Sequence, residues 1–409
     1  MKKISIIFTA LFLLLSGCSS ENYNYTVLAD TKGSLSSLPA ENIAAGVVTT
    51  INDFNFKLSS LSDAQKNVFY STLSIYLALS MTYHGASQAT YDEFTQLLNP
   101  SKQNQPAFLK DVRSIQAAIT NYPETKVKLA NSIWMRDTFA KDVEADFLTR
   151  NKDYFGAMIA SLDFTKSSSI DEINNWVDTN TEHRIQKVID SIDPNAQMYL
   201  INTIYFKADW LMEFAKDSNL QGVFHSDTDI DVTMMHMSES MPYVENTEYQ
   251  AVQLNYKDQK TSMLIVLGKN SEIPITSNSQ YNQLVKGFQN TSVDLTMPKV
   301  NITTEESLAQ TLQTLGLTKA FDPNQADFSA LSKTALDRQL YIMDVLHKAT
   351  LTIDEKGTEA AAATTVIVGV TSMPLNQAVL VIDHPYQLFI IDNESKLILF
   401  SGFITNPLK

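Results

Sequence analysis

The side chains that could carry out catalysis or bind a metal are few in this sequence and lie far apart. Cys18 is the only cysteine, so a cysteine metal cluster is excluded. The six histidines also lack the spacing of metal ligands: His84, His183, His225, His236, His347 and His384. The sequence contains no nucleophile elbow, no nucleotide-binding glycine motif and no zinc-protease motif. A Ser-His-Asp triad built from distant residues leaves no such signature and stays an open alternative. We expect no cofactor, no metal and no catalytic residue.

The stretch from Glu355 to Ser372 suggests another kind of chemistry, a change of backbone structure. Its four alanines favour helix, whereas the five residues after them favour strand. Alternate residues of a strand share a face, and here one face holds only uncharged side chains: Thr358, Ala360, Ala362, Thr364, Val366 and Val368. Such a segment could enter the middle of a sheet, with Gly357 as its hinge and Glu359 facing outward. On these residues alone, an exposed loop followed by an ordinary strand is the alternative.

Motifs on both sides of this stretch favour the first interpretation. Upstream, the apolar run from residue 340 ends in His347-Lys348-Ala349, and downstream His384-Pro385-Tyr386 leads to Phe400-Ser401-Gly402. Together with Glu-Lys-Gly-Thr-Glu-Ala-Ala-Ala from residue 355, these motifs resemble the serpin family. Further family motifs follow in order between about residues 43 and 407, so the resemblance covers nearly the whole chain.

The resemblance implies an α+β architecture, the serpin fold. In this fold a large, mostly antiparallel central sheet is joined by further sheets, about eight or nine helices and an exposed C-terminal reactive-centre loop, here at about residues 355–380. The implied function is suicide inhibition of serine proteases. The cleaved loop inserts into the sheet and traps the covalent acyl-enzyme. A non-inhibitory serpin, acting as a carrier or chaperone, is the alternative. Such a protein would be expected to have a disrupted hinge, whereas this hinge is intact: Glu355, Gly357, Thr358, Ala360, Ala361, Ala362 and Ala363.

Counting along the loop from Glu355 as in other serpins implies cleavage between Thr371 and Ser372. Val370 and Val368 are alternatives for the residue before the bond. No arginine or lysine occurs between residues 356 and 396. We therefore expect elastase-like or subtilisin-like target proteases, with papain-like cysteine proteases as a further class, and not trypsin-like enzymes.

The resemblance also assigns residues around the place where the loop inserts. Glu355 matches a position that pairs with a lysine, here Lys299, and we predict that ion pair. Trp210 matches a residue at the top of the central sheet, and Asn202 one midway down, where strands part. Beneath the sheet, the matching polar positions are Ser71, Ser74 and His347.

The first 17 residues are typical of a lipoprotein signal peptide. Lys2 and Lys3 precede an apolar run, which ends in Leu-Ser-Gly before Cys18. We expect lipidation of Cys18 and anchoring in a bacterial cell envelope, with Ser19 indicating the outer membrane. Residues 18–42 are polar and predict a flexible tether, followed by a single serpin domain over residues 43–409.

Composition limits the class of protein and its partners. The chain has 409 residues, of which 44% are hydrophobic, enough for a large core. Its formal net charge is −14, from 45 acidic and 31 basic residues. This balance argues against nucleic acid as a partner. We expect a monomer that forms 1:1 covalent complexes with target proteases.

The elements expected to position these residues follow from apolar periodicity and helix caps. Helices are predicted over residues 43–58, 71–81, 170–189 and 308–315. Ser71 or Thr72 would cap the second helix, and Gly316 would end the last. Strands are predicted over residues 67–70, 129–134, 200–210, 232–235 and 294–300. Further strands are predicted within residues 250–268, with strand patterns at 251–254 and 262–267. The strand at 200–210 is apolar on both faces in places, as expected for a central strand covered on both sides.

Overall fold

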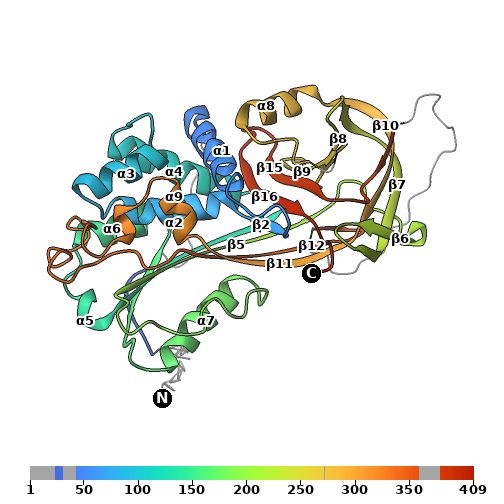
Figure 1. Ribbon diagram of the computed structural model, residues 1–409. Helices are drawn as coiled ribbons and strands as arrows, with labels where there is room; N and C mark the ends of the chain where they lie inside the picture. Colours follow the sequence, from blue (N-terminus) through green and yellow to red (C-terminus); the bar gives the residue numbers. More distant parts are fainter. Residues whose placement is uncertain (1–23, 31–42, 271, 359–377) are drawn as a thin grey trace, which may run out of the picture.

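The computed structural model describes residues 24–30, 43–270, 272–358 and 378–409. Several residues singled out from the sequence lie outside these ranges: Cys18, Ala360, Ala361, Ala362, Ala363, Val368, Val370, Thr371 and Ser372. The described chain is built from two sheets with helices on their faces (Figure 1). This arrangement confirms the predicted α+β class.

The first sheet, called sheet A here, has seven strands in the described residues. Their order is β1 (Thr26–Ala29), β4 (Met158–Leu162), β3 (Lys126–Arg136), β5 (Met198–Asp209), β13 (Gly357–Thr358), β12 (Leu346–Ile353) and β11 (Val300–Ser307). The pairs β3–β4 and β5–β12 are parallel and the others antiparallel, so the sheet is mostly antiparallel as expected.

The second sheet, called sheet B, has nine strands in the part of the chain that the structure describes. Their order is β14 (Ala378–Val381), β10 (Gln289–Pro298), β7 (Asp229–Glu245), β8 (Tyr249–Asn255), β9 (Thr261–Gly268), β15 (Tyr386–Asp392), β16 (Ile398–Ile404) and β2 (Val68–Tyr70), with β6 (Leu220–His225) also pairing to β7. The loop predicted at 355–380 is therefore too long at its C-terminal end, because residues 378–380 belong to β14.

Nine α-helices lie within the described residues. They are α1 (Ala45–Ser59), α2 (Thr72–Tyr83), α3 (Gln88–Leu98), α4 (Gln105–Thr120), α5 (Asp137–Ala140), α6 (Ala145–Phe155), α7 (Ser168–Asn180), α8 (Asn278–Gly287) and α9 (Ala309–Thr314). Short 3-10 helices follow β5 and α9, at Lys216–Ser218 and Lys319–Phe321. Helices α1 to α4 lie on one side of sheet A and α7 on the other (Figure 1). No described helix is long and apolar enough to cross a membrane.

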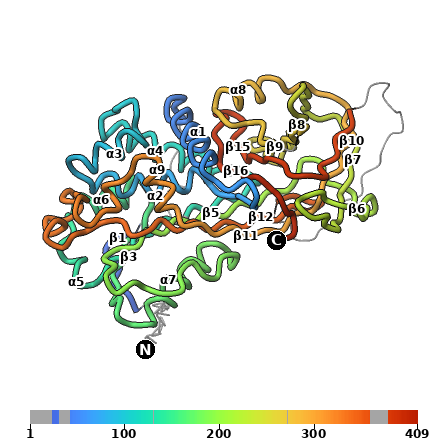
Figure 2. Tube along the Cα trace, viewed as in Figure 1, coloured from blue at the N-terminus to red at the C-terminus, as the bar shows by residue number. Residues whose placement is uncertain are grey.

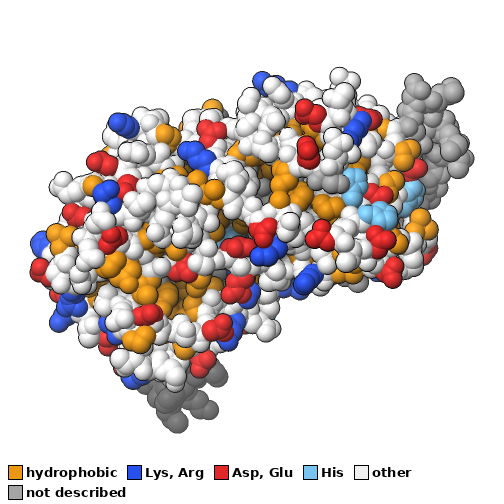
Figure 3. Space-filling model, in the orientation of Figure 1, with side chains coloured by type: hydrophobic (Ala, Val, Ile, Leu, Met, Phe, Trp, Pro, Cys, Tyr) orange, Lys and Arg blue, Asp and Glu red, His pale blue; other side chains and the backbone are white. Residues whose placement is uncertain are grey.

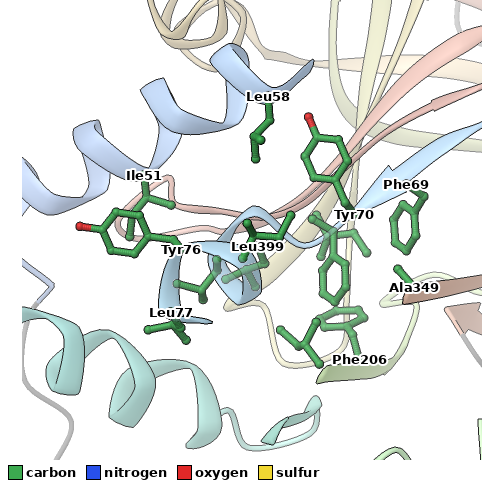
Figure 4. Close-up of a cluster of buried hydrophobic side chains, with 14 of the residues drawn as sticks. Ile51, Leu58, Phe69, Tyr70, Tyr76, Leu77, Phe206, Ala349 and Leu399 are labelled. Carbon is green, nitrogen blue, oxygen red and sulfur yellow. The ribbon is translucent and has the colours of Figure 1, made fainter. Parts of the chain in front are cut away.

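Helix α2 is buried over its whole length and forms the centre of the fold. The Oγ of Ser71 accepts a hydrogen bond from the backbone N–H of Ser74 at 3.2 Å, which confirms Ser71 as the N-cap. Around this helix, side chains from both sheets and from α1 converge in one core (Figure 4). Phe206 of β5 and Ala349 of β12 both point into it. The core therefore contacts both strands that flank the hinge.

Three predicted elements differ from the structure. The strand predicted over residues 294–300 ends at Pro298, and Val300 begins β11, which belongs to the other sheet. The helix predicted over residues 170–189 ends at Asn180, because Glu182 and His183 adopt positive φ values of 53° and 62° that interrupt it. The tether predicted over residues 18–42 is wrong at Thr26–Ala29. These residues form β1, which pairs antiparallel with β4 at the edge of sheet A.

Candidate functional site

Glu355 lies at the top of sheet A, at the start of the hinge, and is held by two side chains. Its Oε1 lies 2.7 Å from Nζ of Lys299 and accepts a hydrogen bond from Nδ2 of Asn219 at 2.5 Å. The Glu355 side chain is only 5% exposed, against 36% for Lys299. Burial opposes its ionisation, but these hydrogen bonds outweigh burial and hold the pKa of Glu355 below its ordinary value. The predicted ion pair is thus present.

Trp210 binds the backbone of the same segment. Its backbone N–H donates to the carbonyl of Lys356 at 2.7 Å, and its indole Nε1–H donates to the carbonyl of Asp354 at 3.0 Å. The indole stacks on Tyr256 with ring centroids 4.6 Å apart and planes 7° apart. Trp210 therefore fixes the chain where it turns from β12 into the hinge, in agreement with its predicted place at the top of the sheet.

Two hinge residues, Gly357 and Thr358, already form a strand, β13, between β5 and β12. Gly357 pairs with Asp209 of β5, and Thr358 pairs with both Ala208 of β5 and Ile353 of β12. A Cβ at position 357 would lie 2.1 Å from the Ala208 carbonyl oxygen, so only glycine fits there. The expectation of an exposed loop from residue 355 is therefore wrong for residues 355–358, which are mostly buried in the sheet.

Thr358 confirms the predicted inward face of the hinge. Its side chain is buried, and its Oγ1 lies 2.7 Å from the hydroxyl of Tyr256. Burial raises the pKa of Tyr256, so this phenol stays protonated and can share the hydrogen bond. Thr358, the one inward-face residue of the hinge that the structure describes, thus points into the core.

Below β13, strands β5 and β12 enclose a small cavity. The two strands pair directly at Ile201 and Leu346, and β13 separates them at their other end. The cavity between these points has a volume of about 30 Å³, which is sufficient to hold a water molecule. Its lining comes from β5, β12, the turn after α7, and sheet B: Phe69, Thr181, Arg184, Ile185, Ile204, Tyr205, Phe206, Thr350, Leu351, Thr352, Thr358, Ile390 and Phe400.

His347 lies beneath this gap and binds the start of α2. Its Nε2 accepts a hydrogen bond from the backbone N–H of Ser71 at 3.1 Å, which places the proton of the neutral ring on Nδ1. Burial lowers the pKa of His347 to about 4, so the ring is neutral at pH 7. The hydroxyl of Ser71 donates to the Leu399 carbonyl at 2.8 Å. The hydroxyl of Ser74 is buried without a partner among the described residues.

Asn202 lies on β5 at the same level as His347 on β12. Its side chain, however, forms a hydrogen bond on the opposite side of β5, with β3. Its Nδ2 donates to Oδ1 of Asn131 on β3, whose own Nδ2 donates to the carbonyl of Phe155 at 2.8 Å. The Oδ1 of Asn202 is buried and has no partner among the described residues. A buried carbonyl without a donor is costly, so this position favours a state that supplies one.

Sequence reasoning missed three contributors to this site. Tyr256 supports Trp210 and Thr358, Asn219 supports Glu355, and Asn131 supports Asn202. Each belongs to another strand or loop and contacts the predicted residue across 46 to 136 positions of sequence. No local motif marks them.

No described group of three or more His, Cys, Asp or Glu side chains has the arrangement of a metal site. On the face shown in Figure 3, basic side chains are scattered singly among acidic ones, so no continuous basic surface lies there. The site consists of a short strand, β13, lodged between the two longer strands β5 and β12.

Comparisons with known proteins agree with this geometry. The family model described as "Serpin (serine protease inhibitor)" matches residues 49–407. An uncharacterised serpin-like protein of Thermococcus kodakarensis is 29% identical over 433 residues, covering 100% of this chain and 99% of the relative. The native state of the thermophilic serpin tengpin has a TM-score of 0.80 at 30% identity, over 90% of this chain and 96% of that one. Thyroxine-binding globulin in complex with thyroxine has a TM-score of 0.76 at 28% identity, over 89% and 100%.

Proposed function

Because the chain belongs to the serpin family, whose members are generally protease inhibitors, we propose that it inhibits serine proteases as a suicide substrate. The predicted serpin fold is confirmed by the family match and the structural likeness. The observation that carries the proposal is β13. Gly357 and Thr358 already lie between β5 and β12, and only small or β-branched residues follow them on the inward face. The strand is therefore ready to lengthen.

Inhibition begins when the serine of a protease attacks the carbonyl carbon of Thr371. The peptide bond to Ser372 breaks, the new amine leaves with a proton, and residue 371 is joined to the protease as an ester. The cleaved loop is then free to extend β13 down the gap between β5 and β12. If insertion precedes water attack on the ester, the protease is carried along and its catalytic groups are displaced. Misplacing reacting groups by about 1 Å can cost roughly a hundredfold in rate.

The register of β13 gives the partners of each inserted residue. Antiparallel pairing of Thr358 with Ala208 places Ala360 opposite Phe206 and Ala362 opposite Ile204. Phe206 and Ile204 both line the small cavity, so small side chains at these levels would enter the core with little displacement of their neighbours. The chain has alanines at both positions.

The same register places Thr364 between Asn202 and His347. Thr364 is the first inward residue after Thr358 that carries a hydroxyl. Its hydroxyl would reach the level of Asn202 Oδ1, the buried acceptor without a described partner. A hydrogen bond gained there would favour the inserted state over the native one, because an unpaired buried acceptor costs about 1–3 kcal/mol.

The expected target proteases accept small or β-branched side chains. The loop offers valine, isoleucine, threonine and glycine near the bond and no basic residue between positions 356 and 396. Elastase-like and subtilisin-like enzymes have suitable primary pockets, and papain-like cysteine proteases form a further class. Trypsin-like enzymes would lack a basic side chain to bind.

The same proposal includes attachment to a membrane. Leu-Ser-Gly-Cys at residues 15–18 supports lipidation of Cys18 after removal of residues 1–17, and Ser19 supports an outer-membrane destination. The target proteases and the lipid bilayer are then the two partners of a monomeric chain in a bacterial envelope.

The test mixes the chain from Ser19 to Lys409, which keeps β1, with neutrophil elastase, subtilisin and trypsin. A band at the summed mass that survives denaturation, with release of a fragment beginning at Ser372 or within two residues of it, is the expected result for one of the first two enzymes. Trypsin is the matched control and should give no complex. Cleavage by elastase and subtilisin without a complex would contradict inhibition.

A carrier function is the alternative, and one feature favours testing it. A cavity of about 510 Å³ lies between the start of α1, the end of α4 and the turns that flank β9 and β16. It is lined by apolar, uncharged polar and charged residues: Ile43, Ala45, Val48, Ala118, Asn121, Tyr122, Pro123, Lys260, Asp392, Glu394 and Ser395. Thyroxine-binding globulin shows that a similar chain can bind a small molecule. Saturable binding of a hydrophobic dye such as ANS, displaced by small aromatic acids, together with an absence of covalent complexes, would favour a carrier.

A further inference from the structure

The short strand β1 joins the N-terminal segment to the edge of sheet A. Thr26 pairs with Ser161 of β4, and the preceding Asn24 binds Oε1 of Glu172 on α7 through its Nδ2 at 2.7 Å. Tyr25 meets Trp134 of β3 edge to face, with ring centroids 5.0 Å apart. Only four residues form the strand, and the side chains of Thr26 and Val27 are exposed. Leu28 and Ala29 pack against the main core and Tyr25 packs against the cluster around Trp134, but all three are only partly buried. This edge strand can therefore open at a lower cost than a central strand.

Strand register shows which end of sheet A this segment occupies. Thr26 pairs with Ser161, Ser161 with Met135, and Met135 with Met198, the first residue of β5. Asn24 therefore lies beyond the start of β5, whereas the hinge pairs with Asp209 at the other end of that strand. Figure 2 shows β1 at the end of the molecule away from β6 and β7, where β4 separates it from β3.

The same register predicts where a trapped protease would come to rest. Continuing β13 by ten residues from Thr358 brings Val368 level with Met198. Thr371, three residues farther on, would then lie beyond the start of β5, at the level of Asn24. Four strand spacings separate the two positions across the sheet, or about 19 Å. The protease and the chain leading to Cys18 would share one end of the domain.

A trapped protease would have to fit between this end of the domain and the membrane. The chain between Cys18 and Asn24 is too short to leave that much space. Six residue steps span at most about 22 Å. A protease of about 220 residues has a radius of gyration near 17 Å and so a diameter of about 44 Å. If β1 leaves β4, the free chain runs from Cys18 to Ile43, which is 25 steps and at most about 90 Å. That length exceeds the diameter of the protease, so the protease would fit between the domain and the membrane.

We propose that strand β1 is a releasable section of the membrane tether, and that a membrane-bound chain can trap a protease only when β1 leaves β4. This rests on the proposed function, namely loop insertion and attachment at Cys18. While β1 is paired, the short tether keeps the far end of sheet A near the membrane and directs the hinge end away from it. Loop insertion brings the protease to the membrane-facing end, and release of β1 makes room for it.

The experiment locks β1 with a disulfide. Thr26→Cys and Ser161→Cys replace register partners of antiparallel strands. Such partners have Cα atoms about 4.5–5.5 Å apart, within the range of a disulfide. The chain from Cys18 to Lys409, with this disulfide closed as shown by thiol titration, is coupled through Cys18 to maleimide-lipid in phosphatidylcholine vesicles. The same protein capped with N-ethylmaleimide stays in solution as the matched control.

Covalent complexes with neutrophil elastase are then counted by denaturing gel. On vesicles, the locked chain should lose most of its complex and yield cleaved, free chain instead, while in solution it should trap as well as the unlocked chain. Adding dithiothreitol, or inserting about 20 Gly-Ser residues after Ser20 to add about 25 Å of average reach, should restore trapping on vesicles.

Three outcomes would overturn the proposal. Equal trapping by the locked chain on vesicles and in solution would show that β1 need not open. Loss of trapping in both settings would show that the lock acts inside the fold, without reference to the membrane. If the unlocked, soluble chain forms no complex at all, the proposed inhibition fails and this proposal fails with it. Because lipid is attached chemically, natural lipidation of Cys18 does not affect the result.

Discussion

Replacing Glu355 by lysine is the change expected to disturb the native state most directly. The carboxylate of Glu355 accepts hydrogen bonds from Lys299 at 2.7 Å and from Asn219 at 2.5 Å. Glu355→Lys removes both acceptors and places a second ammonium group beside Lys299. The segment that leads into β13 would then be held mainly by the backbone contacts of Trp210 and Phe214.

The magnitude follows from burial. Hydrogen bonds to charged groups contribute about 1.5–3 kcal/mol, and the 36% exposure of Lys299 places its bond near the lower value. With like-charge repulsion added, we expect the form with β13 in place to lose about 2–3 kcal/mol of stability. The equilibrium between this closed form and one with an open gap between β5 and β12 would then change roughly 30- to 150-fold. An open gap between β5 and β12 can accept the loop of another molecule as its missing strand.

The assay heats wild-type and Glu355→Lys proteins gently and separates them by size-exclusion chromatography. The variant should form polymers at a temperature where the wild type stays monomeric. A second variant, Glu355→Lys with Lys299→Glu, restores opposite charges and should recover much of the monomer. Unchanged monomer in the single variant, or equal polymer in the single and double variants, would refute the role given to this ion pair.

Three further predictions concern the gap and the residues around it. Gly357→Ala would place a methyl group 2.1 Å from a β5 carbonyl oxygen, so we expect expulsion of β13 and a larger fraction of cleaved, free inhibitor on denaturing gels. Ala362→Arg should turn the inhibitor into a substrate because its side chain would face the core, whereas Ala363→Arg, on the outer face, should still trap; equal trapping by both would refute the register. His347 has a pKa lowered to about 4, so the unfolded state binds more protons between about pH 4 and 6.5, and native stability should fall by about 2 kcal/mol from pH 7 to 5. His347→Gln should remove that part of the pH dependence in denaturant unfolding. Burial also lowers the pKa of His84, to about 3, so His84 adds to the same loss of stability at low pH in both the wild type and His347→Gln.

Local pattern and family motifs were enough to predict much of the site. Alternation along the hinge predicted that Thr358 faces inward, and it does. The match of Glu355 and Lys299 to family positions predicted their ion pair. Ser71 caps α2, and Gly316, with φ of 101°, follows the end of α9. These features depend on periodicity, on cap chemistry or on a motif of adjacent residues, all of which are visible in the sequence.

Other features depended on contacts between distant strands. The pairing of Asn202 with Asn131, and the support of Trp210 by Tyr256, follow from which strands are neighbours and in what register. Sequence periodicity assigns a residue to a face, but it does not say which residue of another strand lies opposite.

Strand β1 shows the same limit most clearly. Residues 26–29 are short and surrounded by polar residues, so composition alone predicted a tether. The strand is stabilised by contacts with other elements. Its backbone bonds to the open edge of β4, Tyr25 packs against the ring of Trp134, and Asn24 bonds to Glu172 of α7. The sequence by itself thus determined the family, the start of the hinge and the direction in which the Thr358 side chain points. Only the tertiary structure decided that the N-terminal segment is part of sheet A, because an edge strand gains its stability from a partner that its own residues do not encode.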